Sequence, residues 1–156
     1  MHYITRSEAD TMTFARALAP MLAPGDTVLL TGDLGAGKSV VARGIARGLG
    51  IEGPMPSPTF TLLMPYEGTN SAKFYHFDLY RLSDPEEYYA AGLDEFVGGD
   101  GIAAVEWPQM AELQPTPALE IALTRGGDDE TRSIEIENYG VRGYDPAALS
   151  EWEERA

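Results

Sequence analysis

The chain has 156 residues, which fits one folded domain better than two, because domains typically run to about 100–150 residues. Its 44% hydrophobic and 23% charged residues exclude a disordered or collagen-like chain. The lack of cysteine excludes disulfides, thiolate zinc sites and a cysteine nucleophile. No apolar run approaches the roughly 18 residues of a membrane span, and no secretory signal pattern opens the chain. We therefore expect a cytoplasmic protein that has no membrane partner.

The charge balance excludes a further class of function. Eleven Lys and Arg residues against 25 Asp and Glu residues give a formal charge of −14, which repels nucleic acids and anionic lipids. A stand-alone nucleic-acid binder is therefore not expected. Because charges are screened beyond about 8 Å at physiological salt, contact with RNA would need a partner that supplies the positive surface.

The first third of the chain predicts helix, strand and helix in succession. Apolar spacing predicts an amphipathic helix over residues 6–22, with Ser7 as its N-cap. An apolar, β-branched run over residues 27–31 predicts a buried strand. A glycine-rich turn and a second helix follow, and this helix ends at Gly48 and Gly50. The proline-rich segment 53–58 predicts an ordered or switching loop.

The rest of the chain predicts two hairpins and short connecting elements. Residues 59–66 and 73–80 form the first predicted hairpin, and residues 118–124 and 131–138 form the second. A capping box at Ser83 opens a helix to residue 91 with Gly92 as its C-cap, residues 102–105 predict a buried strand, and Asp145 caps a terminal helix. The sum is one α/β domain over residues 1–156, with a mixed, mostly parallel central sheet, flanking helices and antiparallel hairpins.

Residues 32–39 match the phosphate-binding P-loop pattern G-x-x-x-x-G-K-[ST] at every fixed position, between a predicted strand and a predicted helix. In such a loop the backbone amides and the helix N-terminus surround phosphate oxygens. Lys38 would reach the β- and γ-phosphates, and the Ser39 hydroxyl would bind Mg²⁺. We predict that ATP is held by the following residues: Asp33, Leu34, Gly35, Ala36, Gly37, Lys38, Ser39, Val40 and Trp107.

Two carboxylates are candidates for metal binding or catalysis near the metal. Glu106 follows four apolar residues at the expected end of a strand, which favours a metal ligand over an edge carboxylate. Asp78 lies among aromatic residues, where a carboxylate needs a cation or donors, and a salt bridge to Arg81 is the alternative. His76 would share a face with Asp78, to orient it or simply to pack. Thr59 is a candidate γ-phosphate sensor, or a turn former.

Four separated motifs together resemble the TsaE family, also called YjeE, the small ATPases of bacterial tRNA threonylcarbamoyladenosine biosynthesis. The P-loop alone is shared by many nucleotide enzymes, whereas the other three motifs discriminate. The matching segments are residues 32–39, Ser57-Pro58-Thr59-Phe60, His76-Phe77-Asp78-Leu79-Tyr80-Arg81 and Val105-Glu106-Trp107-Pro108. Many relatives carry Thr where this chain has Ser39, and both hydroxyls can bind Mg²⁺. No function is carried onto the residues after Pro108.

The resemblance implies a three-layer P-loop fold, in which Thr59 belongs to a switch-like loop, Asp78 is a catalytic carboxylate and Glu106 is a magnesium ligand. With the P-loop assignments added, the expected catalytic residues are Lys38, Asp78 and Thr59, and the expected magnesium ligands are Ser39 and Glu106. It also implies ATP hydrolysis in the service of the TsaB and TsaD subunits, which modify adenosine 37 of tRNAs that read codons beginning with A. The chain would then contact tRNA only indirectly, in agreement with its net negative charge. Two alternatives stay open: a small-molecule kinase, and a nucleotide-dependent switch with little turnover.

Overall fold

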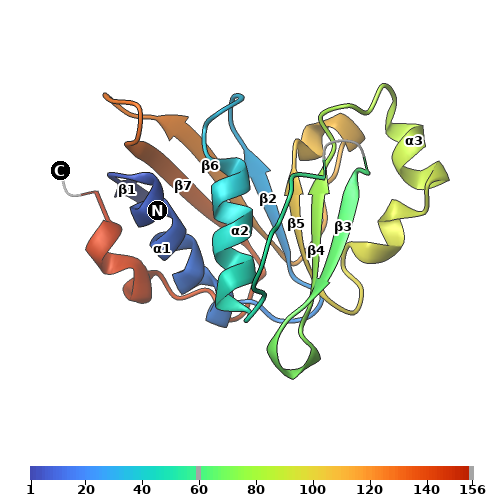
Figure 1. The fold of residues 1–156 in the computed structure, drawn as a ribbon, viewed down its shortest axis with the longest axis horizontal. Helices are drawn as coiled ribbons and strands as arrows, with labels where there is room; N and C mark the ends of the chain where they lie inside the picture. Colours follow the sequence, from blue (N-terminus) through green and yellow to red (C-terminus); the bar gives the residue numbers. More distant parts are fainter. Residues whose placement is uncertain (59–60, 155–156) are drawn as a thin grey trace.

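The computed structural model describes residues 1–58 and 61–154, and its frame is one seven-stranded sheet in the order β1-β7-β6-β2-β5-β4-β3 (Figure 1). The strands are β1 (His2–Thr5), β2 (Thr27–Thr31), β3 (Leu63–Glu67), β4 (Lys73–Asp78), β5 (Ile102–Glu106), β6 (Ala118–Arg125) and β7 (Arg132–Tyr139). The central strands β6, β2, β5 and β4 are parallel to one another. The outer pairs β1–β7, β7–β6 and β4–β3 are antiparallel.

Three α-helices and several 3₁₀ helices cover the sheet in the described part of the chain. The α-helices are α1 (Glu8–Leu18), α2 (Lys38–Gly48) and α3 (Pro85–Ala90). The 3₁₀ helices are η1 (Ala19–Met21), η2 (Thr69–Ser71), η3 (Leu93–Phe96), η4 (Pro108–Ala111) and η5 (Pro146–Trp152). Among the residues described, no helix is long and apolar enough to cross a membrane.

The core lies in two apolar clusters, one on each face of the sheet. Side chains that alternate along β2, such as Val28 and Leu29, point to opposite faces and so belong to different clusters. The first cluster includes the buried sides of α1 and α2, which lie side by side across one face (Figure 1). The second cluster includes Tyr88 of α3 and the apolar residues of η3 and η4. The three layers are therefore α1 with α2, the sheet, and α3 with η3 and η4.

The predicted mixed fold, parallel in the middle and with antiparallel hairpins, is confirmed, and several predicted boundaries are wrong. The first helix spans only Glu8–Leu18, because Pro20 has no N–H to continue it and η1 follows instead. The strand expected over 59–66 begins at Leu63, after Leu62 with a φ of 67°. The strand expected over 73–80 ends at Asp78, whose carboxylate accepts a hydrogen bond from the Tyr80 amide.

Three further differences concern chain segments with weak local signals. The N-cap of α3 is Asp84, not Ser83, and the Ser83 amide donates to Glu87. The predicted terminal helix is the 3₁₀ helix η5, although Asp145 does cap it. Strand β1 was not predicted, since it has four residues and gains its structure by pairing with β7. The predicted N-cap Ser7 and strand Thr27–Thr31 are confirmed.

Helices α1 and α2 approach each other closely through a glycine. A Cβ added at Gly44 of α2 would lie 2.4 Å from the Cβ of Ala15 and 2.8 Å from the carbonyl oxygen of Met12. Both distances are shorter than van der Waals contact. The position of α2 on the sheet therefore depends on a small residue at this crossing. The position of the residues at the N-terminus of α2 depends on it as well.

We predict that Gly44→Ala lowers the free energy of unfolding by about 1–3 kcal/mol, because the clash with α1 outweighs the better helix propensity of alanine. Gly127→Ala is the matched control, since a Cβ at Gly127 meets nothing within 4 Å. Urea unfolding of both variants measures the effect. A Gly44→Ala protein as stable as the wild type would show that the two helices separate freely.

Candidate nucleotide-binding site

The carboxyl ends of the three neighbouring parallel strands β2, β5 and β4 are in register at one edge of the sheet. The register pairs Leu30 of β2 with Glu106 of β5, and Glu106 with Asp78 of β4. Ligands bind at this edge in open α/β sheets. Glu106 lies two residues after Ala104, which belongs to the core cluster beneath α1 and α2, so its side chain is on the α2 face of the sheet. The N-terminus of α2 faces the same edge.

The loop between β2 and α2 has the backbone of a phosphate-binding turn. Gly37 has a φ of 108°, a left-handed conformation that a residue with a side chain rarely adopts, and α2 begins at the next residue. The amides of the first turn of α2 have no partner within the helix and give its N-terminus a partial positive charge. Loop and helix together therefore present donors to an anion.

The side chain of Lys38, the first residue of α2, folds back over this loop. Its Nζ donates hydrogen bonds to the carbonyl oxygens of Gly32 at 2.6 Å and Asp33 at 2.8 Å. The same ammonium lies 4.4 Å from the ring centroid of Trp107, a cation–π contact. Burial lowers the pKa of Lys38, and the carboxylates of Glu106 and Asp78 partly oppose that shift.

Trp107 has a strained backbone conformation. It follows β5 directly with a φ of 60°, which is uncommon for a bulky residue, and Pro108 comes next. Its ring packs against the ring of Tyr80, with the two centroids 4.9 Å apart. Such strain costs on the order of 1–3 kcal/mol and is concentrated at functional sites. The conformation places an aromatic face beside Lys38.

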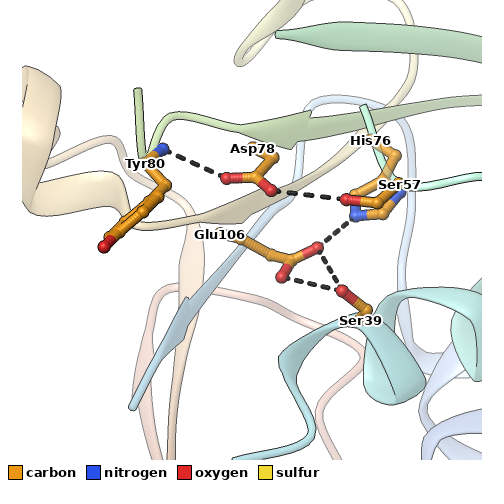
Figure 2. Close-up of polar contacts among 6 residues, drawn as sticks. All are labelled: Ser39, Ser57, His76, Asp78, Tyr80 and Glu106. Carbon is orange, nitrogen blue, oxygen red and sulfur yellow. Dashed lines mark hydrogen bonds and ion pairs between the residues drawn. The ribbon is translucent and has the colours of Figure 1, made fainter. Parts of the chain in front are cut away.

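Glu106 connects the P-loop helix with strand β4, as Figure 2 shows. The Ser39 hydroxyl lies 3.0 Å from both carboxylate oxygens of Glu106 and donates to this carboxylate. The Nε2 of His76 lies 2.6 Å from Glu106 Oε2. Glu106 is 4% exposed and His76 is 1% exposed, so the contact is buried. His76, which the sequence analysis placed beside Asp78, thus contacts the carboxylate of the neighbouring strand.

Asp78 is buried near this cluster and faces another set of donors (Figure 2). Its Oδ1 accepts the amide of Tyr80 at 3.1 Å, and its Oδ2 lies 3.4 Å from the hydroxyl of Ser57 in the proline-rich loop. Asp78 therefore links the end of β4 to that loop. Thr59, the predicted phosphate sensor, lies outside the described residues.

Apart from His76, the side chains described above line one cavity of about 510 Å³. The structure brings together most of the residues that the sequence analysis selected, from the P-loop, β4 and β5: Leu34, Gly35, Gly37, Lys38, Ser39, Val40, Asp78, Glu106 and Trp107. Asp33 and Ala36 do not line the cavity. Ala36 is buried, and the Asp33 carbonyl accepts from Lys38. Arg81 and Ser57 do line it.

One wall of the cavity was missed by the sequence analysis. Glu8 and Thr11 of α1 and the residues Asp129, Glu130 and Arg132 around the start of β7 also line it. They are far from the P-loop in sequence, and no local motif marks them. The sheet order, which puts the β6–β7 hairpin beside β2, brings Asp129, Glu130 and Arg132 to the site, and the packing of α1 against α2 brings Glu8 and Thr11.

The magnesium implied by the motifs fits Ser39 and Glu106. Their hydroxyl and carboxylate oxygens are the ligand type that Mg²⁺ prefers, and they already lie 3.0 Å apart beside the P-loop. The described residues contain no group of three or more His, Cys, Asp or Glu side chains that could hold a metal. Magnesium is commonly bound by one or two protein ligands together with phosphate and water oxygens, so Ser39 and Glu106 are sufficient as protein ligands.

Comparisons with known proteins decide the family. The family model for the threonylcarbamoyl adenosine biosynthesis protein TsaE matches residues 5–134. The chain belongs to the TsaE family. The TsaE protein of Bacillus subtilis (strain 168), named a tRNA threonylcarbamoyladenosine biosynthesis protein, is 42% identical over 139 residues, or 88% of this chain and 85% of that protein. TsaE of Rickettsia bellii is 42% identical over 137 residues, or 86% and 93% of the two chains.

The fold of this TsaE-family chain agrees with a solved structure. The crystal structure of Bacillus subtilis YdiB superposes with a TM-score of 0.75 and 34% sequence identity. The match covers 97% of this chain and 92% of YdiB. The likeness therefore includes the β6–β7 hairpin and η5, which lie beyond the last motif of the sequence analysis.

Proposed function

We propose that the chain is a magnesium-dependent ATPase that acts as an accessory subunit in threonylcarbamoylation of adenosine 37 in tRNA. The observation that carries the proposal is the convergence of Lys38, Ser39 and Glu106 in one cavity at a P-loop, in a member of the TsaE family. The relatives' names place those proteins in threonylcarbamoyladenosine biosynthesis. We extend that role to this chain.

The proposed roles follow from the contacts. The amides of the P-loop and the first turn of α2 bind the phosphates, and Lys38 turns from the carbonyls of Gly32 and Asp33 to the phosphate oxygens. Ser39 and Glu106 would hold Mg²⁺, which neutralises charge on the β- and γ-phosphates. His76 fixes the carboxylate of Glu106 through its buried hydrogen bond.

Asp78 is the proposed catalytic carboxylate. Its Oδ1 accepts the Tyr80 amide, and it lines the same cavity as Lys38, where it can accept a hydrogen bond from the attacking water. Its 3.4 Å approach to Ser57 ties it to the proline-rich loop. In the proposed cycle this loop, which precedes Thr59, closes on the γ-phosphate and opens after hydrolysis.

The partners follow from charge and from the reaction. A formal charge of −14 makes direct capture of tRNA unfavourable, so the proposed contacts are with the TsaB and TsaD subunits, which carry the transfer chemistry.

A kinase would need an acceptor pocket beside the phosphates. Another cavity, of about 380 Å³, is lined by Leu29, residues 113–116, Glu120 and Tyr139, and shares no residue with the first. This second cavity therefore does not supply an acceptor pocket beside the phosphates.

We predict that phosphate release from ATP by the purified chain increases when TsaB, TsaD and tRNA are added, and that Lys38→Ala abolishes it. A colorimetric phosphate assay measures both rates. Phosphorylation of a small molecule would instead identify a kinase. Tight ATP binding without stimulated release would identify a switch and contradict the proposed turnover.

We predict that Asp78→Asn, which keeps the shape of the side chain, lowers the partner-stimulated kcat by about 10²–10⁴-fold, the usual contribution of a positioned acid–base group. Binding of ATP should change much less, because the P-loop contacts remain. Single-turnover kinetics and equilibrium titration separate the two effects. The matched control is Asp84→Asn, the same substitution at the exposed N-cap of α3, outside the cavity. Full turnover in Asp78→Asn would rule out the catalytic role.

We predict that nucleotide binding changes the fluorescence of Trp107, because Lys38 leaves its ring when it binds phosphate. The chain has two tryptophans, and Trp152 is buried against Phe14 of α1, outside the cavity, which makes it the control. Titration with Mg·ADP should change emission in Trp152→Phe and leave it unchanged in Trp107→Phe. The reverse pattern would place the nucleotide elsewhere.

A further inference from the structure

The outer side of the P-loop rests on the β6–β7 hairpin. A Cβ added at Gly32 would lie 2.5 Å from the carbonyl oxygen of Leu123, and one at Gly35 would lie 2.3 Å from a guanidinium nitrogen of Arg125. A Cβ at Gly37 would lie 3.7 Å from Nε of Arg132. The hairpin thus forms the back of the phosphate loop, although the two segments are far apart along the chain.

Arg132, the first residue of β7, makes the polar contacts between hairpin and loop. Its Nε donates to the carbonyl oxygen of Ala36 at 2.9 Å, and its Nη2 lies 3.4 Å from the carbonyl oxygen of Gly35. Its Nη1 donates to the carbonyl oxygens of Asp129 at 2.7 Å and Thr131 at 2.9 Å. One guanidinium therefore bonds to both segments.

The bond to Ala36 fixes the direction of an amide. In a planar trans peptide, the carbonyl oxygen of one residue and the N–H of the next point to opposite sides. Because the oxygen of Ala36 points to Arg132, the N–H of Gly37 points away from the hairpin. This is the amide directly before α2, next to Lys38 in the cavity wall.

We propose that Arg132 is a positioning residue for the phosphate site: it holds the peptide between Ala36 and Gly37 so that the Gly37 amide is directed to a bound phosphate. The proposal rests on the proposed nucleotide binding and extends it to a residue that no motif marks. It concerns the phosphate held by the loop, which ADP and ATP share.

The hydrogen bonds of Arg132 favour this role over a direct contact with the last phosphate of ATP. A guanidinium has five N–H donors, and four hydrogen bonds from Arg132 go to backbone carbonyls. Lysine carries the same charge but has no donor at the Nε position and no planar fork. Lysine therefore cannot bond to the Ala36 carbonyl and to the hairpin loop in this arrangement.

The test compares binding of Mg·ADP and of a magnesium complex of a non-hydrolysable ATP analogue by calorimetry. The variants are Arg132→Ala, Arg132→Lys and, as the control with the same loss of charge, Arg142→Ala at an exposed position outside the cavity. We expect Arg132→Ala to weaken both nucleotides about tenfold, which is about 1.4 kcal/mol. Arg132→Lys should weaken both as well, and Arg142→Ala neither.

Three results would overturn the proposal. They are unchanged affinities in Arg132→Ala, a loss confined to the ATP analogue, and full affinity in Arg132→Lys, which would show that charge alone matters. Thermal unfolding monitors the fold of each variant, and Arg132→Lys carries the test if Arg132→Ala does not fold. A wild-type chain that binds neither nucleotide would contradict the proposed function itself, whereas tight wild-type binding that Arg132→Ala retains would contradict only this inference.

Discussion

The parallel pairing of β2, β5 and β4 is the constraint on which the site depends. It sets Leu30, Glu106 and Asp78 level at one edge, so that a loop leaving β2 meets a carboxylate from each of the two strands that follow it in the sheet. The alternation of side chains along a strand puts Glu106 on the face that α2 covers. The close crossing of α2 with α1 at Gly44 sets the position of α2 relative to the sheet. It thereby sets the 3.0 Å distance between the Ser39 hydroxyl and the Glu106 carboxylate.

Burial of charge is the second physical feature of this edge. Lys38, Asp78 and Glu106 are each less than 10% exposed, and each has hydrogen-bond partners. Burial lowers the pKa of Lys38, and the negative charges of Glu106 and Asp78 oppose that shift. A phosphate group entering the cavity would replace the Gly32 and Asp33 carbonyls as the acceptor of the Lys38 hydrogen bonds.

Local patterns in the sequence predicted most of the elements and selected the candidate site residues, and long-range pairing determined the rest. The motif at residues 32–39 and the carboxylates Asp78 and Glu106, which lie in or after apolar runs, are local signals, and the structure places them in one cavity. The partner of His76 was not predictable, because it depends on the register between β4 and β5. Arg132 contacts Ala36 across 96 positions, and nothing near Arg132 in the sequence signals that contact. Strand β1 likewise exists through its pairing with β7.

The most direct test of the central claim, that Ser39 and Glu106 hold the metal of a bound nucleotide, is a crystal structure of the chain with Mg²⁺ and a non-hydrolysable ATP analogue. We predict phosphates within the P-loop, Lys38 on phosphate oxygens instead of on Gly32 and Asp33, and a metal ion between Ser39, Glu106 and the phosphates. A nucleotide bound outside this cavity, or a metal ion that neither Ser39 nor Glu106 approaches, would contradict the claim.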